Sequence, residues 1–176
     1  MNVADMLNRC TSDGWLTLPE AELLVDTARR TTGPIVEVGT YCGRSAMLLA
    51  QLGRPLVCID PFEGFHSEKS GSEIYKRLWE NLGSIGNADV HVIPSRVEDV
   101  RGPWSFSFDF AHLDGDHSYE GTKRQIQFAL DRGAKDICIH DVNDDGEGEA
   151  VKRAAVEMLG AWDDRAERMA AWYNLQ

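Results

Sequence analysis

Residues 34–45, PIVEVGTYCGRS, place an apolar run directly before a turn that contains Gly39 and Gly43. A buried strand followed by a glycine turn lets backbone approach a ligand closely, and the amides of the next helix point at that ligand. Asp60 ends the next apolar run, LVCID. It follows the turn by about 20 residues, the spacing of a carboxylate that binds ribose hydroxyls. Together these features predict a site for a nucleoside-containing cofactor.

The glycine pattern discriminates between two such cofactors. A dinucleotide turn has three glycines, G-x-G-x-x-G, so that a pyrophosphate can lie against the helix. Here Thr40, Tyr41 and Cys42 separate the two glycines, and no third glycine follows before the predicted helix. Tyr41 would crowd a pyrophosphate, whereas the methionine end of S-adenosylmethionine tolerates its bulk, and Glu37 suits a sulfonium. We therefore expect S-adenosylmethionine rather than a dinucleotide.

A second group of polar side chains follows two later apolar runs. FAHLDGDHSYEG places Asp114, Asp116 and His117 after one strand, and ICIHDV places His140 and Asp141 after the next. Neighbouring parallel strands lie about 4.8 Å apart, so Asp114 and Asp141 could contact one cation. Two close carboxylates repel each other, and a divalent metal such as Mg²⁺ or Mn²⁺ would relieve that repulsion.

Simpler roles stay open for the same residues. Asp116 could cap the helix that follows it, and Asp141 could cap the next loop. His117 could form hydrogen bonds at a helix start, and His140 could be a satisfied core imidazole. Because three acidic groups on one rim exceed what caps require, we keep the metal hypothesis, with Asn143 as a source of a further oxygen.

Hydrophobic periodicity predicts the elements that position these residues. Continuous apolar strands that alternate with helices are typical of a parallel sheet covered on both faces. The strands are expected at 34–39, 55–60, 89–93, 108–113 and 136–141, and the helices at 19–31, 43–52, 72–82, 119–132 and 147–159, after a short helix within 1–16. We expect the strand order 3-2-1-4-5, with a C-terminal strand or hairpin in WDDRAERMAAWYNLQ. Such sheets bind ligands at the carboxyl ends of their strands, which places the glycine turn, Asp60, Asp114 and Asp141 on one rim.

Composition indicates a single globular domain. The chain has 176 residues, of which 43% are hydrophobic and 27% charged, as in ordinary soluble proteins. The net charge of −11 argues against nucleic-acid binding, because phosphate contacts need clustered Lys and Arg. The cysteines Cys10, Cys42, Cys58 and Cys138 form no CxxC pair, which fits reduced thiols and a cytoplasmic location. No leader and no apolar run of membrane-spanning length is evident, so no membrane partner is expected.

Four motifs occur in order along nearly the whole chain, from about residue 14 to 155: VEVGTYCGRS, IDPFEGF, HLDGDHSYEG and IHDV. This combination resembles class I S-adenosylmethionine-dependent methyltransferases. More narrowly, it is similar to the small-molecule O-methyltransferases related to macrocin O-methyltransferase, with catechol O-methyltransferase a more distant relative. The resemblance implies one α/β Rossmann-like methyltransferase domain over residues 1–176. It also implies methyl transfer to a hydroxyl of a small molecule, assisted by a divalent metal.

The resemblance also assigns roles to individual residues. The cofactor-binding positions lie in the glycine turn and at the strand ends: Glu37, Gly39, Thr40, Tyr41, Gly43, Ser45, Asp60, Pro61, Phe62, Ser95, Arg96 and Asp114. Asp114 and Asp141 match the family's metal-binding carboxylates, and Asp116 matches a proposed general base. Relatives often carry two acidic residues where this chain has His140 and Asp141. Because imidazole favours softer transition ions, this departure makes His140 a candidate ligand and leaves metal-free catalysis open, with His140 or His117 as the base.

The surroundings of the acceptor are less defined by sequence. Phe65, His66 and Tyr75 could form a lid, or could belong to an ordinary surface helix and a solvated loop. The N-terminal helices within residues 1–31, with Trp15, are expected to complete the pocket or to form a homodimer contact. A cofactor-binding module without transfer activity, a Rossmann oxidoreductase and a metal-independent N- or O-methyltransferase remain alternatives. A sugar hydroxyl and a phenol are equally compatible acceptors.

Overall fold

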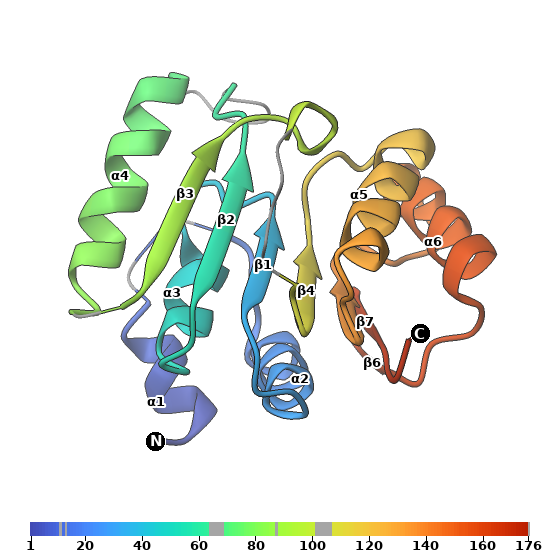
Figure 1. Cartoon of the computed structure of the whole chain (residues 1–176), viewed down its shortest axis with the longest axis horizontal. Coiled ribbons are helices and arrows are strands. Elements are labelled where there is room, and N and C mark those ends of the chain that lie inside the picture. The colour runs from blue at the N-terminus through green and yellow to red at the C-terminus, as the bar shows by residue number, and fades with distance from the viewer. Residues whose placement is uncertain (11, 13, 64–68, 87, 101–106, 176) are drawn as a thin grey trace.

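Five parallel strands form the centre of the sheet: β1 (Ile35–Val38), β2 (Leu56–Asp60), β3 (Val90–Pro94), β4 (Phe110–Leu113) and β5 (Asp136–Ile139). The computed structural model describes residues 1–10, 12, 14–63, 69–86, 88–100 and 107–175. A C-terminal hairpin of β6 (Asp164–Ala166) and β7 (Met169–Trp172) adds two strands, with β7 antiparallel to β5. The full order is β3-β2-β1-β4-β5-β7-β6 (Figure 1). The predicted order of the parallel strands is therefore confirmed, and the C-terminus forms the hairpin.

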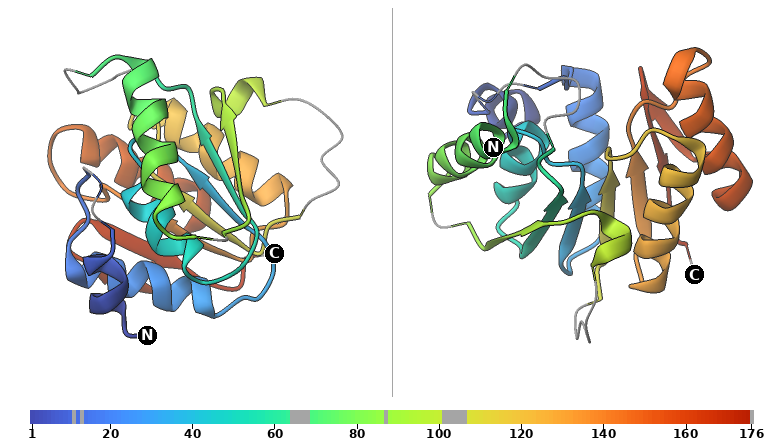
Figure 2. Two further views of the ribbon diagram at one scale, coloured as in Figure 1. Left: turned by 90° about the vertical axis from the view of Figure 1, so that its left-hand side faces the viewer. Right: turned by 90° about the horizontal axis from the view of Figure 1, so that it is seen from above.

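Helices cover both faces of this sheet, as expected (Figure 2). The helices α1 (Val3–Asn8), α2 (Leu18–Arg29), α3 (Arg44–Ala50) and α4 (Gly71–Gly83) pack into one hydrophobic cluster, and α5 (Tyr119–Asp131) and α6 (Gly146–Leu159) into the other. A 3₁₀ turn, η1 (Val97–Asp99), which the sequence did not predict, contacts α5.

The strands supply both clusters because alternate side chains point to opposite faces. Ile35 of β1 and Leu56 of β2 are buried among the residues of α2 and α3, whereas Val36 and Val57 are buried with α5 and α6. Burial on both faces explains why these strands are continuous apolar runs rather than alternating patterns.

Two helices begin with the same reciprocal cap. At the start of α2, the hydroxyl of Thr17 accepts from the N–H of Glu20, and the Glu20 carboxylate accepts from the N–H of Thr17. Ser70 and Glu73 form the equivalent capping box at the start of α4. Such a box satisfies backbone donors that have no partner within the helix.

The predicted boundaries of these strands and helices differ from the observed ones by at most two residues. The difference matters at β5, which ends at Ile139, so His140 and Asp141 belong to the loop after the strand. All four cysteines are buried thiols. Within the described part of the chain, no helix is both long and apolar enough to cross a membrane.

Candidate functional site

A cavity of about 710 Å³ opens at the carboxyl ends of β1 to β5. Its size is typical of small-molecule and cofactor pockets. Most of the residues selected from sequence line it: Gly39, Thr40, Tyr41, Ser45, Asp60, Pro61, Phe62, Ser95, Arg96, Asp114, Asp116, His117, His140 and Asp141. The strand ends therefore share one rim, whereas the binding roles of these residues stay predictions.

Asp60 organises the part of the cavity between β1 and β2. Its Oδ2 accepts hydrogen bonds from the backbone N–H groups of Thr40 (2.9 Å) and Tyr41 (2.8 Å), and its Oδ1 accepts from that of Phe62 (2.7 Å). Burial raises the pKa of this carboxyl, although the three amides oppose the shift. A carboxylate has about four acceptor sites, so about one is left for a ligand hydroxyl.

Two residues bound by Asp60 have left-handed backbone conformations, with φ of 47° at Tyr41 and 52° at Phe62. Asp141, on the same cavity, has φ of 57°. Such conformations are costly for residues other than glycine and are enriched at ligand sites. The carboxylate of Asp60 thus holds two strained residues against the space where a cofactor would lie.

The two glycines of the turn are required by packing within the protein. A Cβ on Gly39 would lie 2.1 Å from the carbonyl oxygen of Asp114, and one on Gly43 would lie 2.5 Å from Leu78. Both glycines also have positive φ, 87° and 91°. Gly39 lines the cavity, but Gly43 faces α4 and does not form part of the cavity wall.

Glu37, expected beside the cofactor, is fully buried and is not part of the cavity wall. Its Oε1 lies 3.1 Å from Nδ1 of His112, its neighbour in β4. His112, which the sequence reasoning missed, does line the cavity. Its Nε2 is buried and has no hydrogen-bond partner among the described residues. The only available signal was a histidine within the apolar strand FAHL.

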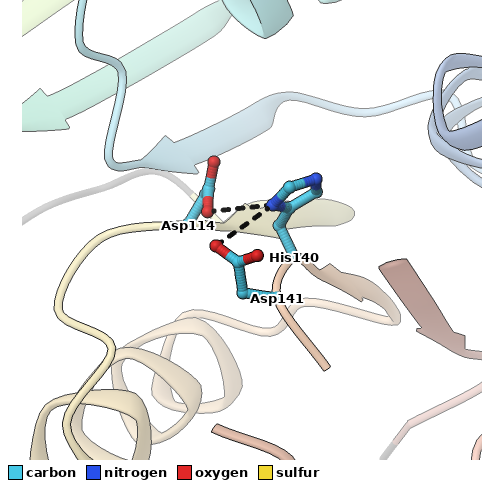
Figure 3. A group of neighbouring side chains, drawn as sticks. All are labelled: Asp114, His140 and Asp141. Carbon is cyan, nitrogen blue, oxygen red and sulfur yellow. Dashed lines mark ion pairs between the residues drawn. The ribbon is translucent and has the colours of Figure 1, made fainter. Parts of the chain in front are cut away.

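Asp114, His140 and Asp141 form a compact polar cluster at the ends of β4 and β5 (Figure 3). One donor atom from each lies within 4.8 Å of the other two. Nδ1 of His140 is 3.4 Å from Oδ1 of Asp114 and 3.5 Å from Oδ2 of Asp141. Two carboxylates and one imidazole fit a divalent cation with mixed oxygen and nitrogen ligands, and the imidazole admits transition ions besides Mg²⁺.

Cationic and acidic side chains surround this cluster. The imidazole of His117 lies 3.4 Å from Asp114, 3.6 Å from Asp141 and 3.6 Å from Glu147. Arg168, in the turn between β6 and β7, places Nη2 2.5 Å from Oδ1 of Asp141. Neither Arg168 nor Glu147 was identified from sequence, because no motif marks them.

The charges within the cluster stabilise one another. Burial disfavours the charged form of His140, but Asp114, Asp141 and Glu20 outweigh this and raise the pKa of His140 to about 12. Burial also opposes ionisation of Asp114, yet His140 and His117 hold its pKa well below the usual range. The contact with Asp114 raises the pKa of His117. Without a metal, Asp114 and Asp141 therefore already face the protonated imidazole of His140.

Other predicted residues have different surroundings. The carboxylate of Asp116 accepts from the N–H of Ser118 (2.9 Å) and lies 3.3 Å from Arg124. It therefore supports the start of α5, where Ser118 itself is the cap. The amide of Asn143 donates to Asp145 (2.7 Å), and Asn143 is not part of the cavity wall.

Aromatic side chains lie near the mouth of the cavity. Trp15 lines it, is 75% exposed, and stacks on Tyr41 with ring centroids 6.2 Å apart. Tyr75 of α4 packs edge-on against Phe62, with ring centroids 5.0 Å apart, so it supports a residue that lines the cavity. The proposed lid residues Phe65 and His66 lie outside the described residues.

The strand order, the antiparallel β7 beside β5 and the cavity at the strand ends define a Rossmann-like methyltransferase fold. Three solved structures share it. Cofactor-bound Rv0187 from MTB superposes with a TM-score of 0.70 at 16% identity, covering 98% of this chain and 87% of that one. The O-methyltransferase TomG from Streptomyces achromogenes, in complex with SAM, gives 0.65 at 17%, covering 91% and 82%. An O-methyltransferase from Bacillus cereus, in complex with SAH, gives 0.65 at 16%, covering 97% and 90%.

Residues 36–142 match the family model of a methyltransferase domain. This span is more than half of the chain, so the protein belongs to this family of methyltransferases. The resemblance drawn from the four motifs is thereby confirmed. A search of curated protein sequences gave no match.

Proposed function

We propose that this protein transfers the methyl group of S-adenosylmethionine to a hydroxyl of a small molecule, with a divalent cation held by Asp114, Asp141 and His140. The observation that carries the proposal is that the Gly39 turn, Asp60 and this cluster line one cavity. The solved relatives bound to SAM or SAH support the choice of cofactor. The O-methyltransferase names of two relatives favour oxygen as the nucleophile.

Methyl transfer needs little covalent chemistry from the protein. The methyl group of a sulfonium is already activated, so the protein has to align the acceptor oxygen with the methyl carbon and the departing sulfur. The oxygen–carbon bond forms as the carbon–sulfur bond breaks, and the sulfur keeps the electron pair as S-adenosylhomocysteine is released. A divalent cation, when bound, would lower the pKa of the acceptor hydroxyl.

His117 is the best candidate to take the acceptor proton. Its imidazole borders the cluster, and its raised pKa favours holding the proton once transferred. Asp116, the base that the resemblance implies, is less suited. Burial raises its pKa, but its contacts with Ser118 and Arg124 outweigh this and lower the pKa overall, which makes it a weaker base.

One observation favours a metal-independent variant of the same reaction. His140 and Arg168 already place cationic groups against Asp114 and Asp141. The carboxylates are thus compensated by the protein itself, and His117 could act without a cation. Activity that survives exhaustive chelation would favour this variant.

The proposal is tested with Asp114→Ala, using Asp26→Ala on the exposed face of α2 as the control. We expect wild-type protein to bind S-adenosylhomocysteine in calorimetry and to transfer labelled methyl from S-adenosylmethionine to a member of a panel of phenols and sugars. Asp114→Ala should keep cofactor binding but lose turnover, and Asp26→Ala should keep both. Full activity of Asp114→Ala would contradict the assignment of the cluster. Binding without turnover on any acceptor in wild type would favour a non-catalytic module.

A further inference from the structure

A carboxylate from α2 contacts the polar cluster from the side opposite Asp114 and Asp141. Glu20 is 2% exposed, and its Oε1 lies 3.4 Å from Nε2 of His140. The other ring nitrogen, Nδ1, faces Asp114 and Asp141 (Figure 3). The imidazole of His140 therefore lies between one carboxylate and a pair of carboxylates.

Both oxygens of Glu20 are occupied as acceptors. Oε2 accepts from the backbone N–H and the hydroxyl of Thr17, at 2.9 and 3.0 Å. Oε1 accepts from the N–H of Arg168 at 3.2 Å and faces His140. A capping box works with Glu or Gln at this position, because the helix start needs one acceptor. An amide has only one acceptor oxygen, so Gln could not serve Thr17 and His140 together.

We infer that Glu20 is a positioning residue of the site, which holds the ring of His140 with Nε2–H toward α2 and Nδ1 toward Asp114 and Asp141. In metal sites, a carboxylate on the second ring nitrogen fixes the orientation and tautomer of a histidine ligand. The contact between Glu20 and His140 is independent of the proposed function, whereas its importance for methyl transfer rests on that function. Arg168 contacts Asp141 through its side chain, and its backbone N–H donates to Oε1 of Glu20.

The chain contains a matched control for a purely structural role. Glu73 forms the same capping box with Ser70, accepting its N–H at 2.7 Å and its hydroxyl at 2.6 Å. Glu73 is exposed and is not part of the cavity wall. Glu73→Gln therefore reports what the substitution does to a cap alone. Thr17→Ala weakens the cap of α2 while leaving the carboxylate opposite His140.

The deciding measurement is ¹H–¹⁵N NMR of the histidine rings at neutral pH, without cofactor or metal, with the His140 signals assigned from their absence in His140→Asn. In wild type we expect a slowly exchanging Nε2–H proton of His140 with a nuclear Overhauser contact to the Glu20 side chain. Glu20→Gln should lose that protection and shift both ring nitrogens, whereas Glu73→Gln and Thr17→Ala should retain the wild-type signals. An absent contact in wild type, unchanged His140 signals in Glu20→Gln, or an equal change in Glu73→Gln would overturn the inference. If Glu20→Gln does not fold, the presence or absence of the Overhauser contact between Nε2–H of His140 and Glu20 in wild type still tests the inference.

Calorimetric titration with Co²⁺ is the second measurement. We expect Glu20→Gln to bind Co²⁺ at least about tenfold more weakly than wild type, since second-shell carboxylates commonly contribute that much, and Glu73→Gln to stay within about twofold. Equal affinity of Glu20→Gln and wild type would contradict a positioning role toward a metal. If wild type binds S-adenosylhomocysteine but not Co²⁺, the metal part of the proposed function fails while the NMR result still decides the role of Glu20. If wild type does not bind S-adenosylhomocysteine, the proposed function fails, and the role of Glu20 is again decided by NMR.

Discussion

Substitution of Asp60 tests whether one carboxylate both builds the cofactor side of the cavity and binds the cofactor. In Asp60→Ala, the N–H groups of Thr40, Tyr41 and Phe62 lose their common acceptor. Hydrogen bonds to a charged group contribute about 1.5–3 kcal/mol each, less where water can replace the partner. Because the turn borders the cavity, water can reach part of it, and we expect a loss of about 2–4 kcal/mol of unfolding free energy.

The effect on cofactor binding has two sources. A ribose hydroxyl loses its acceptor, and the left-handed conformations of Tyr41 and Phe62, each costing about 1–3 kcal/mol, lose the group that holds them. We expect cofactor affinity to fall by about 1–3 kcal/mol, or roughly 5- to 150-fold in Kd. Asp60→Asn should lose less, because its single carbonyl oxygen can still serve the amides of residues 40 and 41 while Phe62 is left without a partner.

The assays are urea denaturation for stability and calorimetry with S-adenosylhomocysteine for affinity, with Asp26→Ala as an exposed control. The expected ranking is wild type equal to Asp26→Ala, then Asp60→Asn, then Asp60→Ala, in both assays. Wild-type affinity together with wild-type stability in Asp60→Ala would refute the reasoning. A loss of stability without a loss of affinity would restrict Asp60 to a structural role.

Two further substitutions test the packing beneath the site. His112→Phe should destabilise the protein by about 3–5 kcal/mol in urea denaturation, because it leaves the carboxylate of Glu37 buried without its imidazole partner. Adding Glu37→Leu should recover part of that stability. An unchanged denaturation midpoint in His112→Phe would contradict the role of this pair. Gly39→Ala should prevent stable folding, because its Cβ would lie 2.1 Å from a carbonyl oxygen. The control Gly53→Ala is also at positive φ, but no atom of the described residues lies within 4 Å of the added Cβ, so it should lose only about 1–2 kcal/mol. Circular dichroism during thermal unfolding compares the two glycine variants, and equal losses would mean that backbone strain, rather than the close contact, sets the requirement at Gly39.

The local elements were predictable because their causes are local. Apolar runs predicted the five parallel strands, of which β1, β2, β4 and β5 are buried, and Pro19 predicted the start of α2 to within one residue. The helix starts follow from caps such as Thr17 and Ser70, whose side chains satisfy nearby amides. The single turn of η1 was missed because one short turn has too few residues to produce a periodic pattern.

The candidate site was predicted in part. Asp60, Asp114 and Asp141 were correctly expected on one rim, because parallel strands end at the same edge of a sheet. Glu37 and Gly43 were expected to line the cofactor site, but neither is part of the cavity wall. Whether a residue near the turn borders the cavity depends on what packs against it, which is His112 of β4 for Glu37 and Leu78 of α4 for Gly43. Sequence spacing does not determine that packing.

What the sequence alone determined was the family, the order of the parallel strands and the residues that follow them, since these depend on periodicity and on short contiguous motifs. Only the tertiary structure decided which distant groups meet at the cluster. Glu20 and Arg168 are separated by most of the chain, yet the packing of α2 beside β5 and the β6–β7 hairpin brings both to His140 and Asp141. No local pattern encodes such contacts, because they arise from the way the helix and the hairpin pack against the same strand.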